Sequence, residues 1–319
     1  MMQNEILSCD WGTTSFRLRL VNVLDKKVVA EIKTEEGVSS VYNQWLQSGK
    51  AENERENFYK AFLRAKIEKL SSTGIQHVSL IISGMASSSI GIRELPYAVL
   101  PFDVAGDGLQ ATTIVADEKF NHNIFLIPGT KTGDDVMRGE ETMLIGCDSD
   151  MTDECMFIFP GTHSKHVFVQ DKMMVDFKTY MTGEIFDLLA NKSILSNSVE
   201  RNEEDRYNPV FEAAVKQGAE TNLLNIAFHV RTNQLFKKLT PKENYFYLSG
   251  LVIGSELKEV AGYHKRIELV CSDELAQPYL TALKVLAGNS RVHYTNADKA
   301  LVNGHCRLAN SLLTQTAKK

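Results

Sequence analysis

The sequence predicts an α/β protein that contains two similar domains, and three observations support this prediction. The chain has 319 residues, a length that favours two domains over one. Along its second half, strand patterns alternate with helix patterns, which is typical of α/β layering. A strand–turn–strand pattern at residues 6–23 returns at residues 155–169, near the middle of the chain. We therefore expect one domain at residues 1–150, a second at residues 151–319, and a cleft that both domains face.

The composition is that of a globular protein, with 43% apolar and 24% charged residues. The net charge of −5 and the lack of a basic block argue against nucleic acid or an anionic membrane as the main partner. Neither a signal-peptide pattern nor an apolar run of membrane-spanning length is present, so we expect a cytoplasmic protein. The five cysteines are scattered, which favours reduced thiols over a disulfide framework or a zinc site. The oligomeric state stays open, and a homodimer is one alternative.

The first strand–turn–strand pattern surrounds residues 9–15, which read CDWGTTS. Glycine allows a ligand to approach the backbone closely, and the neighbouring hydroxyls add hydrogen-bond donors. Such a turn suits a phosphate group, and Asp10 beside it suits the Mg²⁺ that accompanies ATP. An ordinary hairpin turn with a solvated aspartate explains the same pattern equally well. Residues 27–33 predict a third strand, and residues 51–70 predict an amphipathic helix.

A buried strand is predicted at residues 78–82, and a polar loop, residues 83–89, follows it directly. Open α/β sheets bind ligands beyond the carboxyl ends of such strands. A plain connection between a strand and a helix is the alternative. Residues 93–97 then offer two charges and an aromatic ring that suit the hydroxyl groups of a carbohydrate, although a surface loop would have a similar composition.

An acidic segment at residues 133–142 contains four carboxylates and Arg138, and it precedes an apolar helix pattern. Acids are common at a helix start, because the helix dipole favours negative charge in the first turn. That reading leaves the arginine and the density of acids unexplained. A site that needs a general base explains both better.

The second strand–turn–strand pattern surrounds residues 160–165, which read PGTHSK. It repeats the Gly-Thr turn, lacks the aspartate, and adds a histidine and a lysine. Further along, residues 182–184 open a helix, and residues 248–256 carry glycines at positions 250 and 254. These two glycines leave a bare stripe on one helix face. The stripe suits either close helix packing or a flat surface under a base or ribose.

Together these motifs resemble the 2-dehydro-3-deoxygalactonokinase family, which belongs to the actin-like ATPase and sugar-kinase superfamily. The resembling segments extend over nearly the whole chain and comprise residues 10–15, 83–85, 135–142, 160–165, 182–184 and 247–251. The segments 135–142 and 160–165 are specific to the family, whereas the first Gly-Thr hairpin marks only the superfamily. The sequence departs from the family pattern at residues 86–90, near the expected sugar site, and at His166, where the family commonly has tryptophan.

The resemblance implies two ribonuclease-H-like domains with ATP in the cleft between them. It also implies transfer of the γ-phosphate to the 6-hydroxyl of 2-dehydro-3-deoxy-D-galactonate, in galactonate breakdown. One alternative is a kinase of the same superfamily that acts on another sugar or sugar acid. Another is a non-enzymatic, actin-like nucleotide switch.

The resemblance also assigns roles to residues of this chain. Glu140 is the expected general base and Asp135 the second candidate, while Asp10 would bind Mg²⁺ through water. The expected ATP-binding residues are Gly12, Thr13, Thr14, Ser15, Gly161, Thr162, His163, Lys165, Ser249, Gly250 and Gly254. The expected contacts to the sugar acid are Ser83, Gly84, Met85, Arg93, Glu94, Tyr97 and Arg138, of which Arg138 would pair with the substrate carboxylate.

Overall fold

The computed structural model describes residues 4–70, 75–148, 151, 153–201, 209–288 and 291–316. The chain forms two compact units. Unit 1 comprises Met1–Asp150, Lys172–Asp176 and Asp298–Lys319, and unit 2 comprises Met151–Asp171 and Phe177–Ala297. The junction expected near residue 150 includes residues 149, 150 and 152, which lie outside the described residues.

Unit 1 is built on a six-stranded sheet with the order β3-β2-β1-β4-β8-β7. The strands are β1 (Glu5–Trp11), β2 (Phe16–Asn22), β3 (Val28–Thr34), β4 (Leu80–Gly84), β7 (Thr112–Ile114) and β8 (Ile124–Leu126). The first three strands are antiparallel neighbours, as the hairpin pattern predicts, and β4 and β8 continue the sheet in parallel with β1. In this register Asp10 stands opposite Arg17 on β2 and Ser83 on β4.

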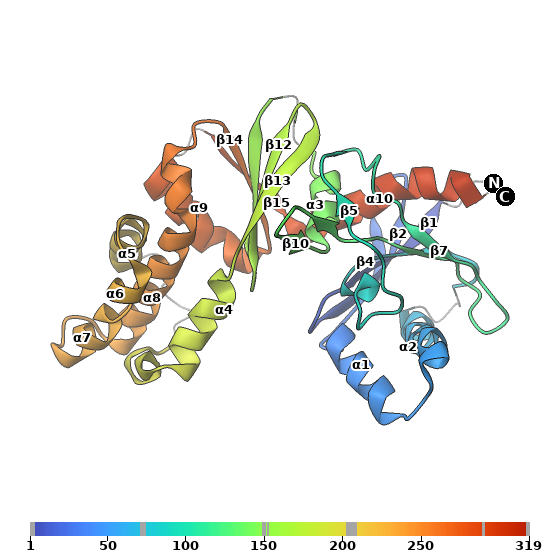
Figure 1. Cartoon of the computed structure of the whole chain (residues 1–319), viewed down its shortest axis with the longest axis horizontal. Helices are drawn as coiled ribbons and strands as arrows, with labels where there is room; N and C mark the ends of the chain where they lie inside the picture. Colours follow the sequence, from blue (N-terminus) through green and yellow to red (C-terminus); the bar gives the residue numbers. More distant parts are fainter. Residues whose placement is uncertain are drawn as a thin grey trace. The chain divides into compact units, whose positions relative to one another are not determined.

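The two faces of this sheet have different coverings. One face carries Leu7, Cys9 and Trp11, which pack in a core with helices α1 (Val38–Gln47) and α2 (Arg55–Leu70). Because side chains alternate along a strand, Ser8 and Asp10 point to the opposite face. That face is covered by α10 (Ala297–Thr316), which lies on the other side of the strands from α1 and α2 in Figure 1.

Helix α10 belongs to unit 1, although the sequence reasoning extended the second domain to residue 319. Two buried contacts show why. The imidazole of His305 bonds to Ser8 on β1, with Nδ1 2.7 Å from the hydroxyl. Asn303 donates to the carbonyl of Gly146, at the end of α3 (Glu140–Gly146), at 3.3 Å. Long-range contacts, not sequence position, therefore assign the last helix to the first sheet.

The remaining elements of unit 1 lie between α1 and α2, or between β4 and α3. They comprise η1 (Glu52–Glu54), η2 (Met85–Ser87) and a three-stranded sheet of order β10-β9-β5, with β5 (Ala98–Val99), β9 (Thr130–Lys131) and β10 (Val136–Met137). Strands β9 and β10 are an antiparallel hairpin, and Asp135 lies in its turn. The chain passes from β10 through two residues into α3, so the acidic segment predicted from sequence spans a hairpin turn and a helix start.

Unit 2 repeats this design. Its sheet has the order β15-β14-β11-β12-β13-β6, in which β6 and the start of β13, which pair with each other, belong to unit 1. The strands are β6 (Phe102–Asp103), β11 (Cys155–Phe159), β12 (Ser164–Gln170), β13 (Met173–Tyr180), β14 (Arg266–Cys271) and β15 (Val292–Asn296). Strand β11 is antiparallel to β12 and parallel to β14, as β1 is to β2 and β4. The prediction of two ribonuclease-H-like α/β domains is confirmed.

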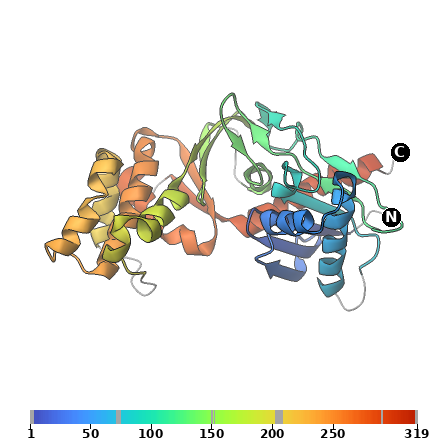
Figure 2. The same cartoon turned by 60° about the horizontal axis from the view of Figure 1, so that its bottom comes forward.

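The helices of unit 2 pack on one another and on the sheet. They are α4 (Thr182–Asp187), η3 (Leu188–Lys192), η4 (Ile194–Ser198), α5 (Pro209–Glu220), α6 (Leu223–Ile226), α7 (His229–Leu235), α8 (Pro241–Glu256), η5 (Leu257–Gly262) and α9 (Asp273–Ala287). Helices α5, α8 and α9 lie side by side, and β13 leads directly into α4 (Figure 2). Helix α8 begins with a capping box, in which Thr240 accepts from Glu243 N and the Glu243 carboxylate accepts from Thr240 N.

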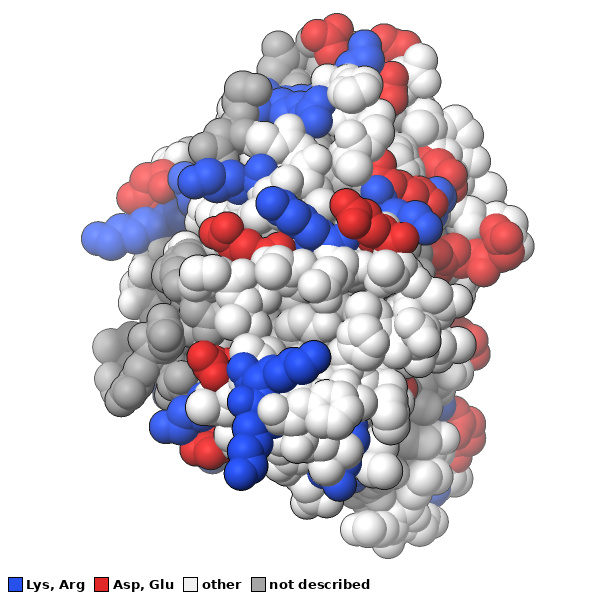
Figure 3. All heavy atoms as spheres, turned by 90° about the vertical axis from the view of Figure 1, so that its left-hand side faces the viewer, with Lys and Arg blue, Asp and Glu red and all other residues white. Residues whose placement is uncertain are grey.

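On the face shown in Figure 3, positive and negative side chains are interspersed among uncharged ones. This mixed surface agrees with the balanced composition of the chain. None of the described helices is long and apolar enough to cross a membrane.

Candidate active site

The turn at residues 12–15 is fixed at its base and open at its tip. Gly12 N donates to Ser15 O at 2.9 Å, and Val38 N at the start of α1 donates to Gly12 O at the same distance. Thr13, Thr14 and Ser15 are exposed. The structure therefore holds the backbone of this turn rigidly while leaving its hydroxyl groups available to an anionic ligand.

Asp10 lies two residues before this turn, near the end of β1. Burial raises the pKa of its carboxyl, and the nearby guanidinium groups of Arg19 and Arg17 lower it in part. Both arginines also pair with Asp298 in the first turn of α10, with Arg19 Nη2 3.0 Å from Oδ1. A cation bound at Asp10 would keep its carboxylate ionised despite the burial.

Two glycines bring the start of α3 against the end of β4. Gly84 has a backbone φ of 89° and Gly139 has a backbone φ of 105°, values that residues with a side chain rarely adopt. A Cβ on Gly139 would lie 3.7 Å from Gly84 Cα, and Gly84 stands opposite Trp11 in the register of β1. Glu140, the first residue of α3, therefore lies at the same end of the sheet as Asp10, beyond the carboxyl ends of two parallel strands.

The acids of this segment have different surroundings. Glu140 is half-buried. Glu141 is 1% exposed, and both of its carboxylate oxygens accept from Gly139 N, at 2.9 and 2.7 Å. Burial, followed by the charge of Glu140, raises the pKa of Glu141 to about 8. Asp135 precedes Glu140 by five residues, and its carboxylate accepts from Val136 N at 2.7 Å. The sequence reasoning included Glu141 in the acidic segment but gave it no role.

Arg138 is held in a defined orientation by two contacts. Its Nη1 donates to Ser87 Oγ at 2.7 Å, and its guanidinium carbon lies 4.1 Å from the centroid of the Tyr97 ring. The structure thus brings together two of the predicted sugar contacts, Arg138 and Tyr97. Ser87, which is fully buried, is a further residue of the group around Arg138. It was not predicted from the sequence as a site residue, although it lies in the polar loop at residues 83–89.

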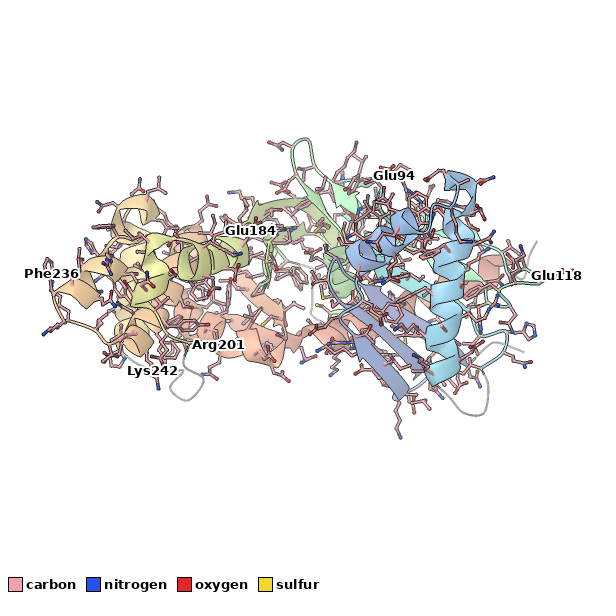
Figure 4. All side chains as sticks on the ribbon, turned by 90° about the horizontal axis from the view of Figure 1, so that it is seen from below. Glu94, Glu118, Glu184, Arg201, Phe236 and Lys242 are labelled. Carbon is pink, nitrogen blue, oxygen red and sulfur yellow. The ribbon has the colours of Figure 1, made fainter. Side chains whose placement is uncertain are left out.

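Other predicted sugar contacts have side-chain partners or surroundings of their own. Ser83 is fully buried, and its hydroxyl lies 3.1 Å from His305 Nε2, so it is not available for direct contact. Met85 packs against the core of unit 1. Arg93 donates to Glu56 on α2 at 2.6 Å, and Glu94 is an exposed side chain on the surface of unit 1 (Figure 4).

In unit 2, the turn between β11 and β12 contains Gly161, Thr162 and His163, and it lies against the start of α4. Glu184 N donates to Thr162 O at 3.1 Å, and the Glu184 carboxylate lies 2.5 Å from His163 Nε2. Thr162 and His163 are exposed, whereas Lys165 is buried and donates to the carbonyl of His163 at 3.0 Å. The turn therefore presents backbone and hydroxyl groups at its tip, and the lysine supports it from within.

A cavity of about 390 Å³ begins at this turn and extends between the helices of unit 2. Its walls combine aromatic rings with a few polar groups, as ligand pockets commonly do. The lining residues are Gly161, Thr182, Gly183, Phe186, Arg201, Phe211, Tyr245, Phe246, Ser249, Val252, Ile253, Glu274, Leu275, Pro278 and Tyr279. Glu184 and Arg201 mark this part of unit 2 in Figure 4. Of the residues expected under adenosine, Ser249 lines the cavity.

Gly250 and Gly254 do not line it. A Cβ on Gly250 would lie 2.6 Å from Phe211 O, and a Cβ on Gly254 would lie 2.1 Å from Val215 O. Both glycines therefore allow the backbone of α8 to pack against α5, and the bare stripe is a helix-packing feature. Both residues are buried in this packing, and their expected contact with adenosine stays a prediction.

Comparison with known proteins identifies the family. The model of the 2-keto-3-deoxy-galactonokinase family matches residues 10–308, nearly the whole chain. The chain belongs to this family. It is 32% identical to a probable 2-dehydro-3-deoxygalactonokinase of Rhizobium meliloti (strain 1021) over 95% of this chain and 96% of that protein. It is also 31% identical to the 2-dehydro-3-deoxygalactonokinase of Escherichia coli (strain K12), over 65% of this chain and 70% of that protein.

A solved structure agrees with this membership. The crystal structure of a Sinorhizobium meliloti protein that is assigned as a 2-dehydro-3-deoxygalactonokinase superposes with a TM-score of 0.81 at 31% identity, and covers 96% of each chain. The resemblance inferred from the motifs is therefore confirmed at the level of the family and of the fold. Membership in a kinase family implies that the chain uses ATP.

Proposed function

We propose that this protein transfers the γ-phosphate of ATP to the 6-hydroxyl of 2-dehydro-3-deoxy-D-galactonate. Family membership supports the reaction. The observation that carries the assignment of sites is the cavity of unit 2, because it joins an aromatic-walled chamber to the Gly161 turn. A nucleotide needs both features, a flat apolar site for its base and backbone groups for its phosphates.

Unit 2 binds the nucleotide in this proposal. The aromatic side chains Phe186 and Tyr245 would contact the base, and Ser249 would contact the nucleoside from α8. The exposed Thr162 and His163 would contact the phosphates from the turn. Lys165 is buried and bonded to the carbonyl of His163, which supports an indirect role in which it holds the turn in shape.

Unit 1 binds the sugar acid and supplies the base. Arg138, held between Ser87 and Tyr97, can offer its remaining N–H groups to the substrate carboxylate. Glu140 would accept the proton of the attacking hydroxyl. Its position at the end of the sheet, next to Gly84, favours it over Asp135, whose carboxylate caps its own hairpin turn. The exposed turn at residues 13–15 would contact the terminal phosphate.

Asp10 is the residue that would hold Mg²⁺. Among the described residues, no group of three or more His, Cys, Asp or Glu side chains is arranged to hold a metal ion. A single carboxylate fits Mg²⁺, since this ion keeps several waters and is usually bound through one or two carboxylates together with the substrate phosphates. The ion would neutralise negative charge on the transferred phosphoryl group.

ADP release, measured with ATP and a panel of sugar acids, tests the proposal. We expect release that depends on 2-dehydro-3-deoxygalactonate and is faster than with its gluconate epimer. Equal or greater turnover of another acid would move the assignment to a different kinase of the superfamily. Slow ATP hydrolysis that no acceptor stimulates would favour a nucleotide switch.

We also place the reaction in the cytoplasm, where ATP is abundant, and the scattered spacing of the five cysteines, which favours reduced thiols, supports this. A homodimer remains a proposal, and sedimentation of the purified chain would measure it.

A further inference from the structure

A chain of buried polar side chains lies beneath the phosphate turn of unit 2, and the proposed reaction does not use it. Its members are Ser164 and His166 on β12, Glu256 at the end of α8, and Tyr279 on α9. The exposed fractions of these residues are 0%, 1%, 4% and 3%. Polar groups buried to this extent need hydrogen-bond partners, and a fully connected set gives a site a unique geometry.

The contacts form one continuous series. Gly161 N lies 3.3 Å from Ser164 Oγ, which lies 3.3 Å from the Tyr279 hydroxyl. The Tyr279 hydroxyl donates to Glu256 Oε2 at 2.6 Å. On the other side of the carboxylate, His166 Nε2 lies 3.1 Å from Oε1. The series therefore connects the backbone of the turn to the carboxylate of Glu256 through two hydroxyl groups.

The hydrogen bonds between the turn and the Glu256 carboxylate follow one direction. Gly161 N–H can only donate, so Ser164 Oγ accepts from it. Because the hydrogen of the Tyr279 hydroxyl goes to Glu256, Ser164 must donate to Tyr279. Each donor from Gly161 to Tyr279 thus points toward the Glu256 carboxylate, which accepts from Tyr279 on Oε2. Removal of any hydroxyl leaves a buried neighbour without its partner.

Tyr279 belongs to this series and to the cavity at the same time. Its ring lines the cavity together with Gly161 and Pro278, while its hydroxyl makes the contacts described above. One side chain thus touches the space assigned to the nucleoside and the support of the turn assigned to the phosphates.

We propose that Tyr279 is a positioning residue, which fixes the Gly161 turn relative to the nucleotide cavity through Ser164 and Glu256. This inference rests on the assignment of the cavity to the nucleotide. Because Gly161 N–H is engaged by Ser164, phosphate contacts come from the following residues of the turn. The hydroxyl of Tyr279 then matters for the phosphates of ATP, and its ring matters for the nucleoside.

The test compares Tyr279→Phe with the wild-type chain, and uses adenosine and ATP as separate probes. The variant keeps the ring and loses the hydroxyl. We expect the Kd for adenosine to stay within about twofold, and kcat/KM for ATP to fall by about 10-fold, the loss typical of one such hydrogen bond. Ser164→Ala breaks the same series of hydrogen bonds at a residue that does not line the cavity. It should likewise lower kcat/KM for ATP and leave the Kd for adenosine nearly unchanged. Tyr263→Phe is the matched control, since Tyr263 packs against the same hydrophobic cluster and does not line the cavity.

Two results would overturn the inference. In the first, Tyr279→Phe weakens the binding of adenosine and the binding of ATP by the same factor, which would assign the effect to the ring. In the second, both series variants keep the wild-type kcat/KM for ATP. If the wild-type chain releases no ADP with any sugar acid, the proposed reaction fails, but the affinities for ATP and adenosine still test the role of Tyr279.

Discussion

Replacement of the buried Glu141 by glutamine should change how the stability of the protein depends on pH. The folded pKa of Glu141 is about 8, against an ordinary value of 4.5. A carboxyl group with a raised pKa stabilises the folded state fully below the unfolded pKa, and this stabilisation is lost as the pH rises through the folded pKa. The window for Glu141 is therefore from about pH 4.5 to about pH 8.

The size of the effect follows from these two pKa values. Each pH unit inside the window costs at most about 1.4 kcal/mol, because the unfolded chain has released one proton that the folded chain still holds. Between about pH 5.5 and about pH 7.5, Glu141 should lower the free energy of unfolding by about 2 to 3 kcal/mol. Glu141→Gln keeps an acceptor for Gly139 N but cannot ionise, so this contribution should disappear.

Chemical denaturation of both chains at several pH values measures this difference. We expect the two free energies of unfolding to diverge as the pH rises, with the variant losing less stability. Glu118→Gln, at an exposed position of the same unit, is the control and should follow the wild type (Figure 4). Parallel curves for wild type and Glu141→Gln would refute the reasoning, since they would mean that Glu141 ionises normally.

Three further predictions concern the reaction itself, and each is measured by ADP release. Asp10→Ala should lower kcat by about 100-fold or more, because the charge on the phosphoryl group loses its metal ligand, and it should leave the fold intact; near-normal turnover would remove Asp10 from the metal site. Glu140→Gln should lower kcat by at least about 100-fold with a modest change in KM, whereas Asp135→Asn should have a smaller effect; the reverse order would make Asp135 the base. Arg138→Ala should raise KM for the sugar acid by roughly 10- to 100-fold, as expected for a charge-assisted pair; an effect confined to ATP would assign Arg138 to the phosphates.

The two hairpins could be predicted from sequence because their signals are local. Alternating apolar residues and a Gly-Thr turn define each of them, and the structure places β1–β2 and β11–β12 accordingly. Helix α1 was not predicted, although its buried residues Val38, Val41 and Trp45 have a helical spacing that could have revealed it. Strand β13 was not predicted either, because it alternates poorly and gains its partners from the sheet.

Features that depend on distant partners could not be predicted. The sequence of α10 does not show that His305 binds Ser8 and Ser83 in the first sheet. The glycines at positions 250 and 254 fit a helix contact and a nucleoside surface equally well, until α5 is seen to pack against them. Nothing local separates Glu140 from Glu141, which differ in burial. The residue types of the site were thus predictable, whereas their division between direct contact and support was not.

The assignment of the unit 2 cavity to the nucleotide is the central claim, and a crystal structure with a non-hydrolysable ATP analogue tests it most directly. We expect the adenine ring in the cavity against the side chains of Phe186 and Tyr245, and the phosphates at Thr162 and His163. Nucleotide density outside this cavity, with the cavity itself filled by solvent, would contradict the assignment.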